Sequence, residues 1–168
     1  MTNNETGHYR RRAAHVVWVG DVPMGGGNPI RVQSMTNTVT IDTEACVAQV
    51  LRIAEAGGEY VRLTTQGVRE AENMRLIHEG VRAAGCRVPL VADVHFNPRV
   101  ADVAALYCEK VRINPGNYVD AARQFKHLEY TDAEYAAELQ KIEDRLLPFL
   151  RICRARHTAV RIGVNHGS

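Results

Sequence analysis

The chain has 168 residues, of which 45% are hydrophobic and 24% are charged, and its formal net charge at pH 7 is +2. This composition is typical of one globular domain with its own core, and it excludes disordered and collagen-like chains. Because the charge is weak and no apolar run is long enough to span a bilayer, we expect neither nucleic acid nor a membrane among the partners.

Residues 1–15 form a polar leader without the apolar centre of a secretory signal, so we expect a cytoplasmic protein. Residues 16–24 then predict a β-hairpin, which is followed by a glycine-rich turn at residues 25–27. Such a hairpin could plug one end of a barrel and bury the ring of Trp18. The alternative is a loose amino-terminal ribbon.

From residue 28 onward the sequence repeats one pattern, in which a short β-branched run ends in polar residues and leads into an amphipathic helical stretch. This repetition of strand and helix is typical of a parallel sheet. We therefore predict an α/β fold with about five βα units. The runs that predict its strands are residues 30–35, 60–64, 89–95, 110–114 and 159–165.

Capping signals predict where the intervening helices begin. Asp42 and Asn97 are typical N-caps, and Thr131 with Glu134 forms a capping box. We expect Pro148 to kink or split the long helix that follows this box. The apolar residues that this helix is expected to bury are Tyr135, Leu139, Ile142, Leu146 and Leu150.

Five βα units with polar strand ends match part of a TIM (β/α)8 barrel, which needs eight units and roughly 250 residues to close. We therefore predict that residues 16–168 form an incomplete TIM barrel, the amino-terminal portion of that fold, with the hairpin ahead of the first unit. An open sheet of this kind has two unpaired edges, and each edge can pair with another copy.

The four cysteines do not form a metal-binding or cluster-binding motif. Cys46, Cys86, Cys108 and Cys153 lie far apart and lack the close pairing of zinc and iron–sulfur motifs. We therefore expect reduced structural thiols and no metal bound by this chain.

Alternation along the predicted strands turns a set of polar residues toward the barrel interior, because residues two apart share a face. In a TIM barrel, such side chains near the carboxyl ends of the strands form the mouth, where active sites lie. The residues in this set are Arg62, Asp93, His95, Arg112, Asn114, Arg161, Gly163 and Asn165.

Arg62, Arg112 and Arg161 come from three separate strands and are expected to converge. Guanidinium groups crowded into a partly dry pocket repel one another unless an anion neutralises them. The pattern favours a phosphate or diphosphate as the occupant, because arginine donates bidentate hydrogen bonds to phosphate oxygens. The alternative is that each arginine pairs with a neighbouring carboxylate or reaches solvent.

Asp93 and His95 could contact a polar substrate, act as a catalytic acid/base pair, form structural hydrogen bonds, or bind a metal without an evident third ligand. We favour substrate contact. Asn114 and Asn165 carry the donors and acceptors that recognise hydroxyl and phosphate groups, although asparagines after strands also form turns. Gln33 begins a polar segment at the expected mouth of the first strand and is a further candidate for binding.

Four ordered motifs carry a family resemblance: residues 32–38 (VQSMTNT), 89–96 (PLVADVHF), 111–117 (VRINPGN) and 161–165 (RIGVN). Together they resemble the hydroxymethylbutenyl diphosphate synthase family of the non-mevalonate isoprenoid pathway. The resemblance covers essentially the whole chain from residue 11. Residues 130–135 and 165–168 look like the long form of the family, which carries an additional domain.

The resemblance implies a barrel of the dihydropteroate-synthase type that holds a methylerythritol cyclodiphosphate at its mouth. It implies a reaction that opens the ring of this substrate by a two-electron reductive dehydration. The residues that it implies for substrate binding are Arg62, Asp93, His95, Arg112, Asn114, Arg161 and Asn165.

The resemblance also implies a 4Fe-4S cluster, held by three cysteines and a glutamate in a later domain and reduced by ferredoxin or flavodoxin. In the family that cluster domain caps the barrel of the partner subunit, so the enzyme is a homodimer. Nothing in this chain corresponds to the cluster domain. We therefore expect this polypeptide alone to be an inactive part of an iron–sulfur oxidoreductase.

Two alternatives remain open from the sequence. A pterin- or diphosphate-binding transferase of the related barrel type would also need an anion pocket, although the four motifs speak against it. A non-catalytic fragment that associates with itself through its open sheet edges would bind phosphate only incidentally.

Overall fold

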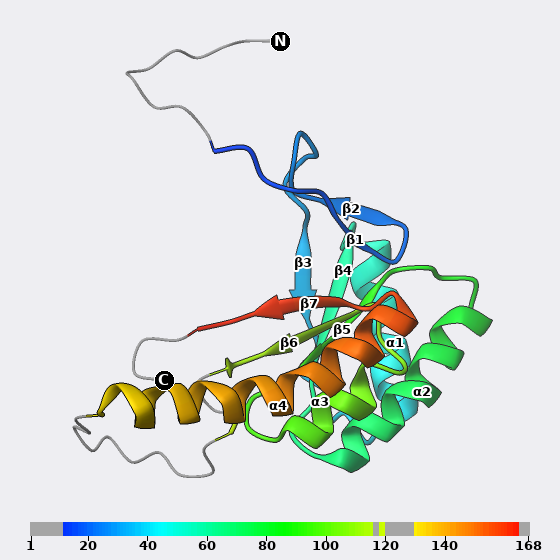
Figure 1. The fold of residues 1–168 in the computed structure, drawn as a ribbon. Coiled ribbons are helices and arrows are strands. Elements are labelled where there is room, and N and C mark those ends of the chain that lie inside the picture. Colours follow the sequence, from blue (N-terminus) through cyan, green and yellow to red (C-terminus); the bar gives the residue numbers. More distant parts are fainter. Residues whose placement is uncertain (1–11, 116–117, 120–129, 165–168) are drawn as a thin grey trace.

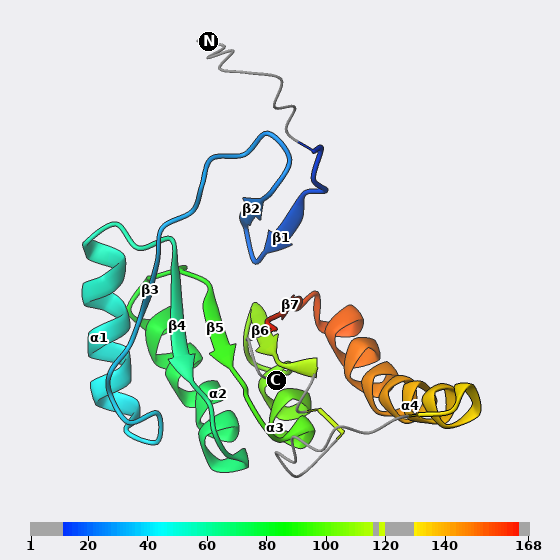
Figure 2. The same cartoon turned by 90° about the vertical axis from the view of Figure 1, so that its left-hand side faces the viewer.

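The computed structural model describes residues 12–115, 118–119 and 130–164 of the chain. Their main feature is a sheet of five parallel strands with helices against one face and a separate two-stranded hairpin at one end (Figure 1). Figure 2 shows that the sheet curves and that the helices lie on its outer side. The predicted α/β class with a parallel sheet is confirmed.

The strands lie side by side in sequence order, which is the topology of a βα repeat. They are β3 (Gln33–Met35), β4 (Tyr60–Thr64), β5 (Leu90–Asp93), β6 (Lys110–Ile113) and β7 (Ala159–Ile162). All five lie within the predicted runs, but most are shorter. The first strand begins later than predicted because the amide of Val32 donates to the Glu59 carboxylate at 2.8 Å.

Four helices of the described chain connect these strands, and three of them begin at the predicted caps, whereas α2 follows Gly67 without a side-chain cap. The side chain of Asp42 accepts a hydrogen bond from the amide of Ala45 at 3.0 Å, and that of Asn97 accepts one from Arg99 at 3.0 Å. In the described residues, no helix has both the length and the apolar character that crossing a bilayer requires. The helices are α1 (Thr43–Glu55), α2 (Val68–Ala83), α3 (Pro98–Ala104) and α4 (Asp132–Arg156).

Helix α4 differs from its prediction in two respects. It begins with the expected capping box of Thr131 and Glu134, but the expected split at Pro148 is wrong, because the helix continues through this exposed residue. Water can solvate the carbonyl that loses its amide partner there. Phe149 is buried, whereas the amino-terminal half of the helix extends beyond the sheet (Figure 1). The expected burial is therefore wrong for Tyr135 and Leu139, and it is also wrong for Leu150, which is 39% exposed.

The main hydrophobic core lies between the sheet and the helices. Val61 and Leu63 of β4, and Val111 and Ile113 of β6, point toward the helices and are at most 1% exposed. They pack with helix residues such as Met74. Because burial of this face determines the strand register, the residues between them point to the opposite face, which we call the inner face.

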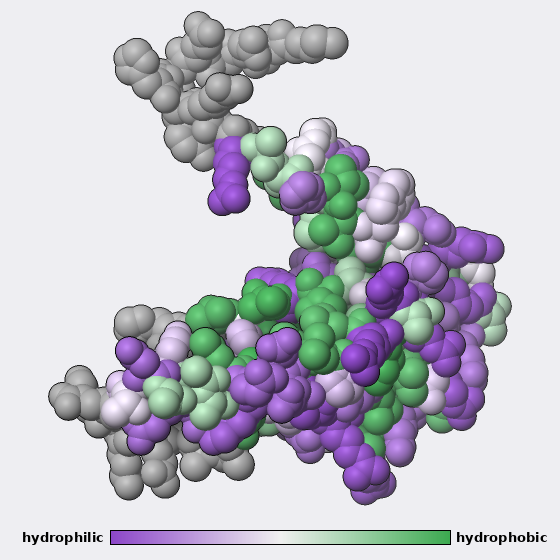
Figure 3. All heavy atoms as spheres, in the orientation of Figure 1, coloured by the Kyte–Doolittle hydropathy of each residue, from purple (hydrophilic) through white to green (hydrophobic). Residues whose placement is uncertain are grey.

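The sheet has two edge strands, β3 and β7. Figure 3 shows apolar surface gathered over β7, where Ile162 is 61% exposed. Ile30, which precedes β3, is also strongly exposed. Both edges of the described sheet therefore carry apolar side chains of the kind that helices cover in a complete parallel sheet.

The hairpin of β1 (Val17–Val19) and β2 (Val22–Met24) covers the inner face where the strands begin. Val19 is fully buried, whereas Trp18 is 59% exposed. The expected burial of Trp18 is wrong because alternation along β1 turns its ring away from the side that buries Val19. The covering cluster consists of Val19, Tyr60, Val91 and Ala159, with Val22 and Met24 packed against it.

Candidate functional site

Strand pairing aligns four polar residues in one row across the inner face. Thr64 of β4 pairs with Asp93 of β5, Asp93 pairs with Arg112 of β6, and Arg112 pairs with Arg161 of β7. Arg62 lies two residues before Thr64 and shares its face. The row lies at the carboxyl ends of parallel strands, which is where βα-barrel proteins place their sites.

Asp93 is the centre of a charged cluster in this row, and its side chain is only 5% exposed. Its Oδ2 lies 3.5 Å from Nε of Arg62 and 3.3 Å from Nε2 of His95, and its Oδ1 lies 3.5 Å from Nη1 of Arg112. Among the described ion pairs, one carboxylate therefore serves two guanidinium groups. In these pairs the guanidinium groups outnumber the carboxylate.

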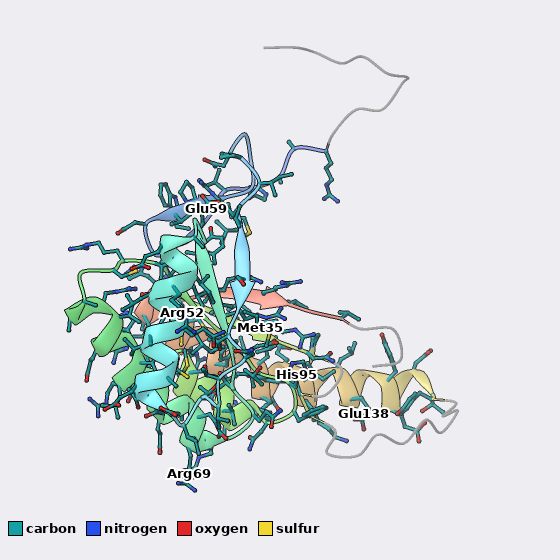
Figure 4. The ribbon with its side chains drawn as sticks, turned by 180° about the vertical axis from the view of Figure 1, so that it is seen from behind. Met35, Arg52, Glu59, Arg69, His95 and Glu138 are labelled. Atoms are coloured by element: carbon teal, nitrogen blue, oxygen red, sulfur yellow. The ribbon has the colours of Figure 1, made fainter. Side chains whose placement is uncertain are left out.

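His95 lies beside both Asp93 and Arg112. Nη1 of Arg112 is 3.0 Å from Nδ1 and 3.3 Å from Nε2 of the imidazole, and it donates to whichever ring nitrogen lacks a proton. Figure 4 shows the labelled His95 toward this end of the sheet and Glu59 toward the opposite end. The imidazole, the carboxylate and the guanidinium group thus form one hydrogen-bonding unit.

Two further contacts hold the arginine side chains. Nη2 of Arg62 donates to Sδ of Met35 at 3.2 Å, and Nη2 of Arg112 donates to the carbonyl of Gly163 at 3.3 Å. Sequence reasoning did not identify Met35 as a contact. Its position in β3, opposite Arg62 in the strand register, is the signal that places it on the inner face.

A cavity of about 580 Å³ lies on the inner face toward the hairpin. Arg161 and Gln33 line it together with Tyr60 and Lys110. Arg161 is thus beside Arg112 in the strand register, but no described contact joins it to the cluster around Asp93. The placement of Gln33 at the mouth of its strand is wrong, because β3 begins at this residue.

Lys110 is a buried cation that sequence reasoning missed. It is 6% exposed, and its Nζ lies 5.6 Å from the centre of the Tyr60 ring, which it contacts through a cation–π interaction. Burial lowers the pKa of Lys110, and the charge of Arg161 lowers it further. Shared parity with Arg112, two positions later, is the signal that predicts its inward direction.

Of the two asparagines that the sequence predicts as binding residues, the structure describes only Asn114. Asn114 follows β6 on the inner face, two positions after Arg112, and is 1% exposed. Asn165 lies outside the described residues. The structure therefore brings together Arg62, Asp93, His95 and Arg112, and it places Asn114 in the next position along the same face as Arg112.

No group of three or more His, Cys, Asp or Glu side chains in the described chain is arranged to hold a metal ion. The four cysteines are free thiols, and three of them are buried. Burial raises the pKa of Cys153 to about 11 and raises the pKa of Cys108 as well. These two thiols are therefore protonated and unreactive at neutral pH.

The charged cluster is suited to hold an anion with attached hydroxyl groups. Its guanidinium groups can donate paired hydrogen bonds to phosphate oxygens. The carboxylate of Asp93 can accept hydrogen bonds from hydroxyl groups, and the imidazole of His95 can donate to them or accept from them. The surrounding sheet already holds the side chains in place, so little ordering is needed when a ligand binds.

Comparison with known proteins identifies relatives of this chain. Residues 14–168 match the family described as GcpE TIM-barrel domain. Proteins named 4-hydroxy-3-methylbut-2-en-1-yl diphosphate synthase (flavodoxin) are 73% identical over 161 residues in Bacteroides fragilis, 51% over 160 residues in Akkermansia muciniphila and 47% over 162 residues in Porphyromonas gingivalis. These alignments cover 95–96% of this chain but only 26–27% of each relative. The chain therefore spans about a quarter of the length of the curated relatives it matches.

Proposed function

This chain belongs to the GcpE TIM-barrel domain family, and from that premise we propose that it is the substrate-binding barrel part of an isoprenoid-pathway enzyme. The proposed reaction converts 2-C-methyl-D-erythritol 2,4-cyclodiphosphate reductively to 4-hydroxy-3-methylbut-2-enyl diphosphate, the product that the relatives' name contains. One observation carries the proposal: Arg62 and Arg112 share the single carboxylate of Asp93 at the carboxyl ends of the strands.

In this proposal the chain's own residues bind and orient the substrate. Arg62 and Arg112 hold the diphosphate, and the positive charge that they retain beside Asp93 attracts it. His95 and Asp93 receive the hydroxyl groups of the substrate. The remaining proposed contacts are Asn114, Arg161 and Asn165, whereas Gln33 lies toward the hairpin and is left out.

The proposed reaction is a two-electron reductive dehydration, for which a 4Fe-4S cluster supplies the electrons when it is bound. The described residues do not fit such a cluster, because Cys46, Cys108 and Cys153 are buried and no group of suitable ligands is present among them. We therefore place the cluster ligands in another part of the full-length protein. A polypeptide of residues 1–168 should bind the cyclodiphosphate without reducing it.

The proposal extends to the partners of the full-length protein. Relatives of this chain are named for flavodoxin, which supports flavodoxin rather than ferredoxin as the electron donor. The full-length enzyme is proposed to be a cytoplasmic homodimer with a barrel of the dihydropteroate-synthase type. The free state of the four cysteines is in keeping with a reducing compartment.

Calorimetric titration of residues 1–168 tests the proposal. The cyclodiphosphate should bind saturably and more tightly than inorganic phosphate, and Arg112→Ala should abolish the difference. Arg75→Ala is the matched control, because Arg75 is an exposed α2 residue paired with Glu79 at 2.8 Å. Equal affinity for both ligands, or binding that Arg112→Ala leaves intact, would count against the assignment.

Two further measurements accompany the titration. Light scattering of the same sample reports whether the chain associates with itself. Incubation with the cyclodiphosphate and a chemical reductant should yield no product. Product formation by residues 1–168 would contradict the proposal that this part of the protein binds the substrate without reducing it.

A further inference from the structure

Arg112 and Arg161 are neighbours in the strand register and point to the same face, so their charges would repel if both guanidinium groups extended straight inward. The two side chains instead separate. Arg161 lines the cavity toward the hairpin, whereas Nη2 of Arg112 donates to the carbonyl of Gly163 at 3.3 Å. Gly163 is the next inward position after Arg161 on the same chain segment.

The guanidinium group of Arg112 occupies the space that a side chain at position 163 would need. A Cβ atom added to Gly163 would lie 2.3 Å from Nε and 2.9 Å from Nη2 of Arg112. The backbone of Gly163 does not have the positive φ that favours glycine at other positions of this chain, such as Gly57 and Gly85. Space for Arg112, rather than backbone conformation, therefore accounts for a glycine here.

The opposite side of the same guanidinium group is also in contact. Its Nη1 lies 3.0 Å from Nδ1 of His95 and 3.5 Å from Oδ1 of Asp93. Arg112 is buried, and so is Asp93. The guanidinium group of Arg112 therefore lies between Gly163 on one side and the Asp93–His95 pair on the other.

We propose that Gly163 is a positioning residue of the anion site, which acts by leaving room for the Arg112 guanidinium group over Asp93 and His95. This inference deepens the proposed function and rests on it only in taking the cluster to be an anion site. A methyl group at position 163 should push the guanidinium group out of its contacts. Anion affinity should then fall although no residue that donates to the anion has been changed.

The test is Gly163→Ala in the 168-residue chain, with inorganic phosphate and the cyclodiphosphate as separate probes. We expect affinity to fall about tenfold, as when a charge-assisted contact is lost. The matched control is Gly27→Ala, because a Cβ at Gly27 meets nothing within 4 Å and the residue has no positive φ. This control should bind both probes as the unmodified chain does.

A second background separates positioning from a general structural role. In Arg112→Lys, the slender ammonium side chain retains the charge but has no branched group to meet a new methyl. Gly163→Ala should therefore change the affinity of Arg112→Lys less than twofold, and it should lower the unfolding temperature less than it does in the original chain. An equal loss of affinity in both backgrounds would overturn the proposal.

The remaining outcomes are also decisive. Unchanged affinity of Gly163→Ala in the original chain would overturn the positioning role. If Gly163→Ala fails to fold, the double variant with Arg112→Lys should fold again, and failure of both would refute a clash with Arg112. Equal binding of phosphate and cyclodiphosphate would refute the proposed function, yet the dependence on Gly163 could still be measured with either probe.

Discussion

The two ends of the inner face show how one strand can serve both stability and binding. At the hairpin end, Tyr60 and Val91 are at most 1% exposed and pack against Val19. Two residues further along the same strands, Arg62 and Asp93 form part of the charged cluster. Because alternation returns to the same face every second residue, a shift of two positions replaces a packed apolar layer with an anion site.

The ion pairs at the two ends differ in the same way. At the hairpin end of the sheet, on the side of the helices, the carboxylate of Glu109 accepts hydrogen bonds from Arg82 of α2 at 2.7 Å and from the amide of Leu90 at 2.8 Å, and it contacts His78 at 2.9 Å. At the other end, one carboxylate serves two guanidinium groups. In the described ion pairs, the carboxylate of Glu109 therefore meets one guanidinium group, whereas that of Asp93 meets two.

The largest effect on stability is expected from the hairpin end. Tyr60→Ala removes a fully buried ring and its contact with Lys110, so the free energy of unfolding should fall by about 3–5 kcal/mol. Urea denaturation measures the change, and Tyr60→Phe, which keeps the ring, is the control. A loss below about 1 kcal/mol for Tyr60→Ala would contradict the stated difference between the two ends of the inner face, because the apolar layer at the hairpin end would then not stabilise the fold.

A smaller loss is expected when the ion pair of Glu109 is changed. Burial raises the pKa of Glu109, but hydrogen bonds from His78 and Leu90 and the charge of Arg82 outweigh it, so the pKa is lowered from the ordinary 4.5. Glu109→Gln should lower the free energy of unfolding by about 1–3 kcal/mol at pH 7.

The pH dependence of Glu109→Gln follows from the direction of that shift. A carboxyl group with a lowered pKa contributes fully above its unfolded-state value of 4.5, and the contribution is lost as pH falls through the lower folded-state pKa. The difference between the original chain and the variant should therefore shrink on acidification below pH 4.5. Urea denaturation at several pH values tests this, and a constant difference would contradict it.

At the charged end, the effect should appear in binding rather than in stability. Arg112→Ala should weaken cyclodiphosphate binding about tenfold to a hundredfold. The free energy of unfolding should change by less than about 1 kcal/mol, because Arg62 still accompanies the carboxylate of Asp93. Calorimetry and urea denaturation on one preparation measure both quantities. Strong destabilisation would make Arg112 part of a structural ion pair, as at Glu109.

The smallest effect is expected from Trp18, although its ring is the largest side chain of the hairpin. Trp18 is 59% exposed, so Trp18→Ala should change the free energy of unfolding by less than about 1 kcal/mol. Val19→Ala, one position later, is the comparison variant and should cost more, because Val19 is fully buried. If the order of the two effects were reversed, the hairpin would cover the sheet with its other face.

Much of the fold could be predicted because its signals are local. The caps at Asp42 and Asn97 depend on amides within three residues, and each strand lies within its predicted run. Alternation along the strands also predicted that Asp93, His95 and Arg112 face the same side of the sheet. These features depend on capping residues and on the spacing of apolar and polar residues along one element, and both can be read directly from the sequence.

Other features depended on contacts between distant segments. Tyr135 is exposed because α4 extends beyond the sheet, and Gln33 lies toward the hairpin because it is the first residue of β3. Arg161 points to the same face as Arg112 but lines the cavity toward the hairpin, whereas Arg112 lies in the cluster around Asp93. Like-charge repulsion and the space at Gly163 decide between these directions, and neither is visible in one strand.

The order of residues by itself determined which side chains face inward, because alternation in a strand is a property of the backbone. Only the tertiary structure decided which of those side chains meet, because the stagger between strands and the room beside each group depend on neighbours far away in the chain. For this protein the difference is clearest at Arg112. Alternation within β6 determines that its side chain points inward, whereas the position of its guanidinium group depends on the absence of a side chain at Gly163, which follows the neighbouring strand β7.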